Sequence, residues 1–163
     1  DNLGFTALHI ASQKGHLEVA RLLLSKSEID INKAADTGQT ALYNASEKGH
    51  LEVVRLLLSK SEIDINQARD GGYTALSIAS QKGHLELVRL LLSKSEIDIN
   101  EAADDGITAL YIASQDGHLE VVRLLLSKSQ IDIDKATETG ATALMIAKQQ
   151  GHSEIVKLLE NHN

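Results

Sequence analysis

The histidines of this chain are the first residues whose type and spacing could do chemistry. The sequence has seven of them, and five follow a glycine in a "GH" step that recurs along the chain. Zinc holds its ligand nitrogens at about 2.0–2.1 Å, whereas equivalent residues on neighbouring packed helices lie about 8–10 Å apart. These side chains therefore cannot share one metal ion, and we predict structural histidines that bond backbone between neighbouring units. The five are His16, His50, His84, His118 and His152.

The other chemical motifs are incomplete. Asp30 and Asn32 copy the first two ligand positions of a calcium loop, but Ala34 stands at the third and the glycine is misplaced. The sequence has no Gly-Lys-Ser/Thr phosphate cradle, no nucleophile with a companion base, and no cysteine. We therefore expect a protein that is not an enzyme and that uses neither a metal nor a cofactor.

The elements that carry these residues repeat along the chain. The string "LLLSKSEIDIN" occurs three times, 34 residues apart, and returns a fourth time as "LLLSKSQIDID". A fixed period of about 20–50 residues is the signature of a stacked-repeat architecture. We predict a single domain over residues 1–163 without an internal boundary. Its units are residues 1–34, 35–68, 69–102, 103–136 and a shorter fifth unit, 137–163.

Each unit predicts two short helices and a loop. Thr6 can cap a first helix that runs roughly from Ala7 to Lys14 and ends at a glycine. The run "LEVARLLLSK", which begins at Leu17, has apolar residues along one stripe and charged residues opposite, as an amphipathic second helix requires. In the following "SEIDINKAADTG", apolar and polar residues alternate before the segment becomes polar, which indicates an extended arm and a turn.

The stretch "GFTALHIASQKGHLEVARLLL", followed by "IDIN", resembles the ankyrin repeat family, and the resemblance extends over all five units. It implies an all-α solenoid of stacked helix-turn-helix repeats with extended hairpin-like loops. It also implies binding of protein partners through the hairpin tips and the concave face of the first helices.

Three features depart from the family pattern. Alanine replaces proline at the first helical position of every unit. The glycine that usually ends the second helix is missing, and the period is 34 residues where the family commonly has 33. The histidine of the Thr-Pro-Leu-His motif remains only as His9, so the hydrogen-bond network that it makes in the family is not expected in the other units.

Composition limits the classes of partner. With a net charge of −7 and an apolar fraction of 42%, the sequence is not that of a disordered chain and has no basic surface for nucleic acid. No apolar run approaches the roughly 20 residues of a membrane span, and the first residues lack the layout of a signal peptide. We expect a monomer with a protein partner, neither a nucleic acid nor a membrane as partner, and a cytoplasmic location if the protein is natural.

The differences between units predict where a partner binds. Units two and three differ at eight positions, and all but one lie on the turn or the first helix. The three tyrosines, the single phenylalanine and the single methionine all fall on one stripe there. Tyrosine is typical of recognition surfaces, so we predict that this stripe is exposed and unnecessary for the repeating core; the alternative is that its rings pack against the neighbouring hairpin. The candidate partner-binding residues are Phe5, Gln39, Tyr43, Asn44, Glu47, Tyr73, Ser77, Ile107, Tyr111, Gln115 and Met145.

The turns add acidic residues beside this stripe. They favour a partner with basic residues at the rim of the interface, although the Asp-Gly pairs at Asp70 and Asp105 are equally ordinary turn chemistry. They are Asp36, Asp70, Asp104, Asp105 and Glu138.

The sequence also predicts caps at the ends of the stack and one destabilising residue inside it. Lys148, Gln149 and Gln150 indicate that the fifth unit is a polar C-terminal cap, with Ala20 as a weaker counterpart at the start of the chain. Asn44 stands where the other units have isoleucine, and we expect it to be destabilising if it is buried.

The sequence thus predicts a non-enzymatic protein-binding module. The alternative is a designed or structural repeat scaffold with no specific partner. The near-verbatim copies are typical both of a consensus or engineered scaffold and of a recently duplicated natural array, and the sequence leaves both origins open.

Overall fold

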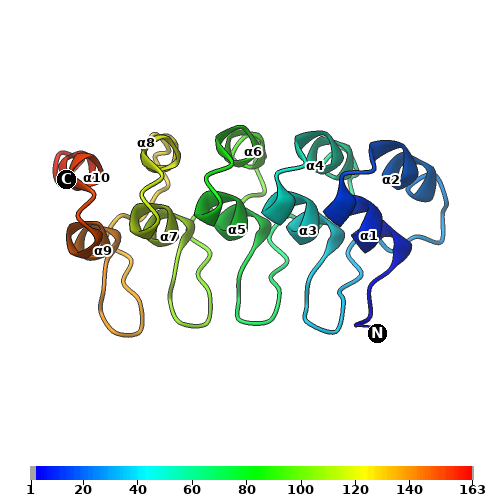
Figure 1. Ribbon diagram of the computed structural model, residues 1–163, viewed down its shortest axis with the longest axis horizontal. Helices are drawn as coiled ribbons and strands as arrows, with labels where there is room; N and C mark the ends of the chain where they lie inside the picture. The colour runs from blue at the N-terminus through cyan, green and yellow to red at the C-terminus, as the bar shows by residue number, and fades with distance from the viewer. Residues whose placement is uncertain (1–2, 163) are drawn as a thin grey trace.

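The chain is a row of five helix pairs, seen in a computed structural model that describes residues 3–162. In Figure 1 the first helix of each pair lies in one row and the second helix in another, while a hairpin-like loop projects downward before each pair except the first. Residues 3–162 contain no strand, and one isolated bridge joins Ala102 to Thr108. The helices are α1 (Ala7–Lys14), α2 (Leu17–Leu23), α3 (Ala41–Lys48), α4 (Leu51–Leu57), α5 (Ala75–Gln81), α6 (Leu85–Leu91), α7 (Ala109–Gln115), α8 (Leu119–Leu126), α9 (Ala143–Gln150) and α10 (Ser153–Glu160).

The predicted threonine caps start every first helix. Thr6 accepts a hydrogen bond from the backbone N–H of His9, and Thr40 accepts one of 3.1 Å from that of Tyr43. Such a cap stabilises a helix by about 1 kcal/mol, because it satisfies one of the free amides of the first turn. The second helices are shorter than expected: α2 stops at Leu23, and the Ser25 hydroxyl donates to Leu22 O at 2.7 Å in the turn that follows.

The apolar core lies between the two rows of helices. Each interior unit contributes a leucine from its first helix and another from its second, and small alanines at the centre of the first helices let neighbouring helices approach closely. Every one of these leucines is at least 98% buried, so the core continues from unit to unit without a break. They are Leu42, Leu57, Leu76, Leu91, Leu110 and Leu125.

The loops form a second ordered layer below the helices. Within one hairpin, Ala35 N–H donates to Gln39 O at 2.9 Å, and between hairpins Asp36 N–H donates to Leu3 O at 2.9 Å. The same pairs of bonds recur in the later hairpins, so the turn tips are tied in register along the stack. This register holds the tip residues at fixed spacing beside the row of first helices.

The two ends of the stack differ. Lys148 and Glu160 form an ion pair of 2.7 Å on the fifth unit, and its role as a polar C-terminal cap stays a prediction. The expectation for Ala20 is wrong, because its side chain is fully buried in the core and presents nothing to the free side of the first unit.

Candidate functional site

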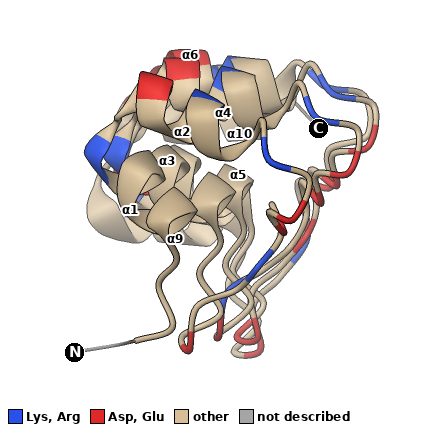
Figure 2. Cartoon of the chain, turned by 90° about the vertical axis from the view of Figure 1, so that its right-hand side faces the viewer, with Lys and Arg blue, Asp and Glu red and all other residues tan. Residues whose placement is uncertain are grey.

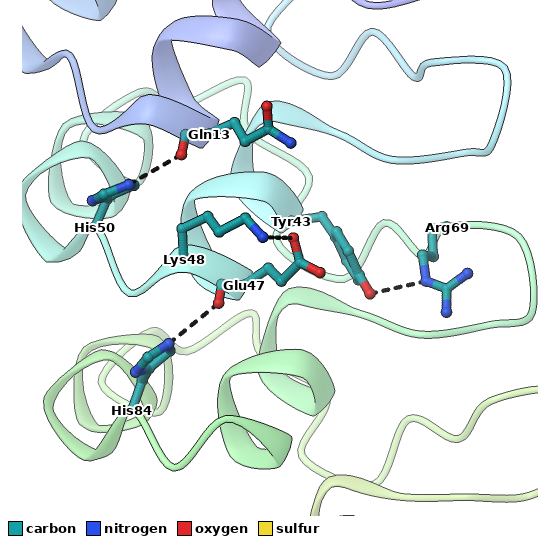
Figure 3. Close-up of polar contacts among 7 residues, drawn as sticks. All are labelled: Gln13, Tyr43, Glu47, Lys48, His50, Arg69 and His84. Carbon is teal, nitrogen blue, oxygen red and sulfur yellow. Dashed lines mark hydrogen bonds and ion pairs between the residues drawn. The ribbon is translucent and has the colours of Figure 1, made fainter. Parts of the chain in front are cut away.

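The histidines of the "GH" step connect each unit to the preceding one. The Nε2–H of His50 donates to Gln13 O at 3.1 Å, and that of His84 donates to Glu47 O at 3.3 Å (Figure 3). The equivalent contacts are His118 with Gln81 O at 2.8 Å and His152 with Gln115 O at 3.0 Å. The prediction of inter-unit backbone bonds is confirmed for these four, and the acceptors are carbonyls of a last helical turn that have no partner within the helix.

The glycine before each histidine makes this contact possible. Gly15 has a φ of +72°, and a Cβ at this position would lie 2.6 Å from Nδ1 of His50. The position therefore requires glycine both for its backbone conformation and for the ring that packs on it.

A second inter-unit contact lies in the "IDIN" loops. The Asn32 amide donates to Glu62 O at 2.7 Å and accepts from Asp64 N–H at 2.9 Å, while Asp30 accepts from Asn32 N–H at 3.0 Å. Asn66 and Asn100 make the same pair of bonds to the units that follow them. The motif is therefore a structural ladder. From the sequence alone, this motif is considered only as an incomplete calcium loop. The identical asparagine in three loops is the signal that could have indicated its structural role.

The hairpin tips are strongly acidic. Figure 2 shows red residues gathered at the ends of the projecting loops, while the row of first helices above them is mostly free of charge. All of these acidic tip residues are exposed. The surface between the hairpin tips and the first helices is therefore negatively charged along the tips and mostly uncharged along the helices.

Arg69 interrupts this acidic edge. Its Nε–H donates to Tyr43 Oη at 2.9 Å, and Nη1–H donates to Asp70 O at 3.0 Å (Figure 3 shows the former). The guanidinium carbon lies 5.0 Å from the ring centroid of Tyr73 and 5.6 Å from that of Tyr43, within the range of cation–π attraction. The Tyr73 hydroxyl reaches Asp105 at 3.5 Å. We call Tyr43, Arg69, Tyr73 and Asp105 the Arg69 cluster.

The surroundings of the two tyrosines keep their hydroxyls protonated. Burial raises the pKa of Tyr43, and the bond from Arg69 offsets only part of this effect. Burial also raises the pKa of Tyr73, and the negative charge of Asp105 adds to it. Both rings are therefore neutral at physiological pH, and Arg69 supplies the positive charge of the cluster.

His9 makes the network that its motif suggests. Its Nδ1 accepts from Thr6 N–H at 3.0 Å and its Nε2–H donates to Gln39 O at 2.9 Å, while Phe5 stacks edge-on at 5.4 Å. Burial lowers the pKa of His9, against the opposing effect of the Gln39 carbonyl. The neutral ring is therefore the form that fits this position.

The candidate residues separate into an accessible and a buried group. Met145 is 57% exposed, and six residues are half-buried. The half-buried residues are Phe5, Gln39, Glu47, Tyr73, Ile107 and Gln115. The buried residues are Tyr43, Asn44, Ser77 and Tyr111.

The expectation that no ring of the stripe takes part in packing is therefore wrong for two tyrosines. Tyr43 is 3% exposed and Tyr111 is 9% exposed, whereas Met145 at the same place in the last unit is largely exposed. The comparison gives the reason: this position faces the following unit, which covers it everywhere except at the end. Helical spacing showed that these residues share a face, but not that a neighbour covers the face.

Asn44 and Ser77, also proposed as contacts, lie below the surface. Ser77 donates to Thr74 O at 3.0 Å and accepts from Thr74 N–H at 2.9 Å, which closes a helix cap. Asn44 is 1% exposed, and neither atom of its amide has a hydrogen-bond partner within residues 3–162. Neither side chain is accessible to a partner in this structure.

Arg69 is the functional candidate that sequence reasoning missed. It was one of the eight differences between units two and three, where Ala35 stands in the other unit. A single cation at a position where units two and four have alanine was the available signal. Its two aromatic neighbours come from separate units, so their convergence required the structure.

Residues 3–162 contain no group of three or more potential metal ligands. None of the helices in that range is long and apolar enough to cross a membrane.

Comparison with known families agrees with the fold. Residues 3–36 match the family described as "Ankyrin repeat", and residues 30–103 and 95–163 match "Ankyrin repeats (3 copies)". No curated protein matches the chain. The matches cover the stack from its first helix pair to its last, and ankyrin repeats indicate in general a protein–protein interaction module, typically without catalytic activity. The chain therefore belongs to the ankyrin repeat family.

Proposed function

We propose that this ankyrin stack binds a protein partner through the face formed by the first helices and the hairpins, with Arg69 and Tyr73 at its centre. The observation that carries the proposal is the Arg69 cluster, in which the guanidinium lies against two tyrosine rings from consecutive units. Arginine and tyrosine are enriched among the residues that dominate binding energy at protein interfaces.

Pre-organisation supports the same assignment. Arg69 is held by Tyr43 Oη, by Asp70 O and by the Tyr73 ring, so little side-chain freedom remains to be lost on binding. In this arrangement the buried Tyr43 positions Arg69, and Tyr73 and Arg69 meet the partner. Tyr111 and Asn44 act in packing and make no direct contact.

The accessible residues around the cluster vary between units. Gln39, Tyr73 and Ile107 occupy equivalent positions before the helix caps of units two, three and four. Glu47 and Gln115 occupy equivalent positions near the ends of α3 and α7. A surface that changes from unit to unit while the core remains constant suits recognition of one irregular partner.

Charge indicates the character of that partner. The acidic tips favour basic residues at the rim, and Arg69 favours a carboxylate or carbonyl group near the centre of the contact. We therefore expect a protein segment that carries an acidic or polar residue flanked by lysines or arginines.

A pull-down with three baits tests the proposal. The first is the unchanged chain, the second carries Gln39→Ser, Tyr73→Ser and Ile107→Ser, and the third carries Glu52→Ser, Glu86→Ser and Arg89→Ser on exposed helix positions. We expect the first and third baits to retain the same proteins and the second to lose them. Retention of the same proteins by all three baits would contradict the proposed face.

A further inference from the structure

The hairpin tip of unit three contains an aspartate followed by a glycine at the centre of a turn. Gly72 N–H donates to Arg69 O at 2.9 Å and closes this turn, so Asp70 and Gly71 are its two central residues. Gly71 has a φ of +87°, as the second central residue of a type II turn requires, whereas Thr37 holds the equivalent place in unit two. Both central residues are exposed to solvent.

The reacting groups of this pair are not held by other contacts. Within residues 3–162, the Gly71 N–H has no hydrogen-bond partner and the carboxylate of Asp70 accepts no hydrogen bond. Glycine has no side chain to hinder the approach of its nitrogen to the preceding carboxyl carbon. The bond of 3.0 Å from Arg69 Nη1–H to Asp70 O draws negative charge from the peptide group and so favours loss of its N–H proton. An aspartate in these surroundings can cyclise onto the amide that follows it.

A second aspartate–glycine pair, in the hairpin of unit four, lies one place later in its turn. Gly106 N–H donates to Ala103 O at 2.8 Å and itself closes the turn. The carboxylate of Asp105 accepts a hydrogen bond of 3.2 Å from Ile107 N–H. Both reacting groups are therefore engaged, and the turn must open before this pair can cyclise.

The third aspartate–glycine pair lies at the end of α7 and is held by packing. Asp116 N–H donates to Ile112 O at 3.0 Å in the last turn of the helix. A Cβ on Gly117 would lie 2.7 Å from the ring of His152, and this ring donates to Gln115 O at 3.0 Å. Cyclisation here must reorient the peptide beneath the ring and so disturb a contact between two units.

We propose that Asp70 is a site of spontaneous isoaspartate formation in the folded protein. The nitrogen of Gly71 attacks Cγ of Asp70, a C–N bond forms, and the carboxyl hydroxyl leaves with the amide proton as one water, which gives a succinimide. Water then adds to the main-chain carbonyl carbon of Asp70 and breaks its bond to the Gly71 nitrogen. The chain now continues through Cβ and Cγ, the mass is unchanged, and the α-carboxylate keeps the negative charge.

The product lengthens the backbone where three hairpins meet. Asp70 N–H donates to Thr37 O at 3.2 Å, and Gly71 O accepts from Asp104 N–H at 3.1 Å. The added backbone carbon lies between these two bonds, so isomerisation disturbs the register of the tips and the neighbouring Arg69. Any effect on partner binding rests on the proposed function, whereas the modification itself does not.

Incubation of the unchanged chain at neutral pH, below its melting transition, tests the site. Samples taken over time are digested with trypsin, and electron-transfer fragmentation, which gives isoaspartate its own fragment ions, measures the isomer in peptides 70–82 and 95–123. We expect isoaspartate to form at Asp70 at least about five-fold faster than at Asp105 or Asp116, because each of these must first lose a contact worth about one hydrogen bond. In urea, where the fold is lost, all three should react at similar rates.

Gly71→Thr is the matched variant, because it gives the turn the Asp-Thr-Gly sequence of unit two. The branched side chain hinders the attacking nitrogen, so isoaspartate at residue 70 should be lost while Asp105 and Asp116 keep their rates. Thermal melting checks that the variant folds, and the comparison of three sites in the unchanged chain decides the question even if it does not. Equal rates at the three sites of the folded chain, or an unchanged rate at Asp70 in folded Gly71→Thr, would overturn the proposal.

Discussion

Arg69 Nε–H donates a hydrogen bond of 2.9 Å to the hydroxyl of Tyr43, a residue that lies one unit earlier in the stack. The bond joins a hairpin to the end of a buried ring, so one contact serves both the packing of two units and the position of a half-buried cation.

Loss of Arg69 should weaken the stack modestly. Arg69→Ala removes the bond to Tyr43 and the contacts with both rings, and we expect the free energy of unfolding to fall by about 1 kcal/mol. Arg89→Ala is the matched control, because Arg89 forms an exposed ion pair of 3.6 Å with Glu86; such a pair contributes about 0–1 kcal/mol. Urea denaturation of both variants measures the difference, and equal losses would show that the cluster adds nothing to stability.

The two classes of tyrosine should respond differently to truncation. Tyr111→Ala opens a cavity at a buried position and should lower the free energy of unfolding by about 3 kcal/mol. Tyr73→Ala changes a half-buried residue at the surface and should cost less than about 1 kcal/mol. Thermal melting compares the variants directly. A Tyr111→Ala protein that melts with the unchanged chain would mean that its ring is not a packing element.

Asn44→Ile should stabilise the protein. The amide is buried without a hydrogen-bond partner in the described residues, and isoleucine occupies the equivalent position in the four other units and is buried in three of them. Removing an unsatisfied buried polar group should raise the free energy of unfolding by about 1–3 kcal/mol. The reverse change, Ile78→Asn, is the control and should destabilise. A lower urea midpoint for Asn44→Ile would indicate that the amide is hydrogen-bonded in solution.

Stability should decline at mildly acid pH through His9. Its pKa in the fold lies below its ordinary value of 6.5, so between these two values the unfolded chain binds the extra proton. The contribution is therefore complete above pH 6.5 and is lost as the pH falls through the folded pKa. His9→Ser, which copies the residue of unit three, should remove this part of the pH dependence. A constant difference between the two proteins from pH 8 to pH 5 would contradict the assignment.

The sequence predicted the repeat, the threonine caps and the histidine bonds, because each depends on local spacing or on a motif that recurs identically. It did not predict the burial of Tyr43 and Tyr111, since whether a helical face meets solvent depends on the neighbouring unit. The convergence of Arg69 with Tyr43 and the bonds of Asn32 to the next loop were also missed. Both join residues 26 to 32 positions apart, beyond the reach of helical periodicity.

The most direct test of the proposed binding face is the affinity of Tyr73→Ala for a partner that the unchanged chain retains. Titration calorimetry would give the two dissociation constants, and thermal melting of the same samples would report the fold. We expect affinity to fall about thirty-fold, equivalent to about 2 kcal/mol, while the melting temperature shifts by no more than a few degrees. Unchanged affinity in a folded Tyr73→Ala variant would contradict a binding face centred on Arg69 and Tyr73.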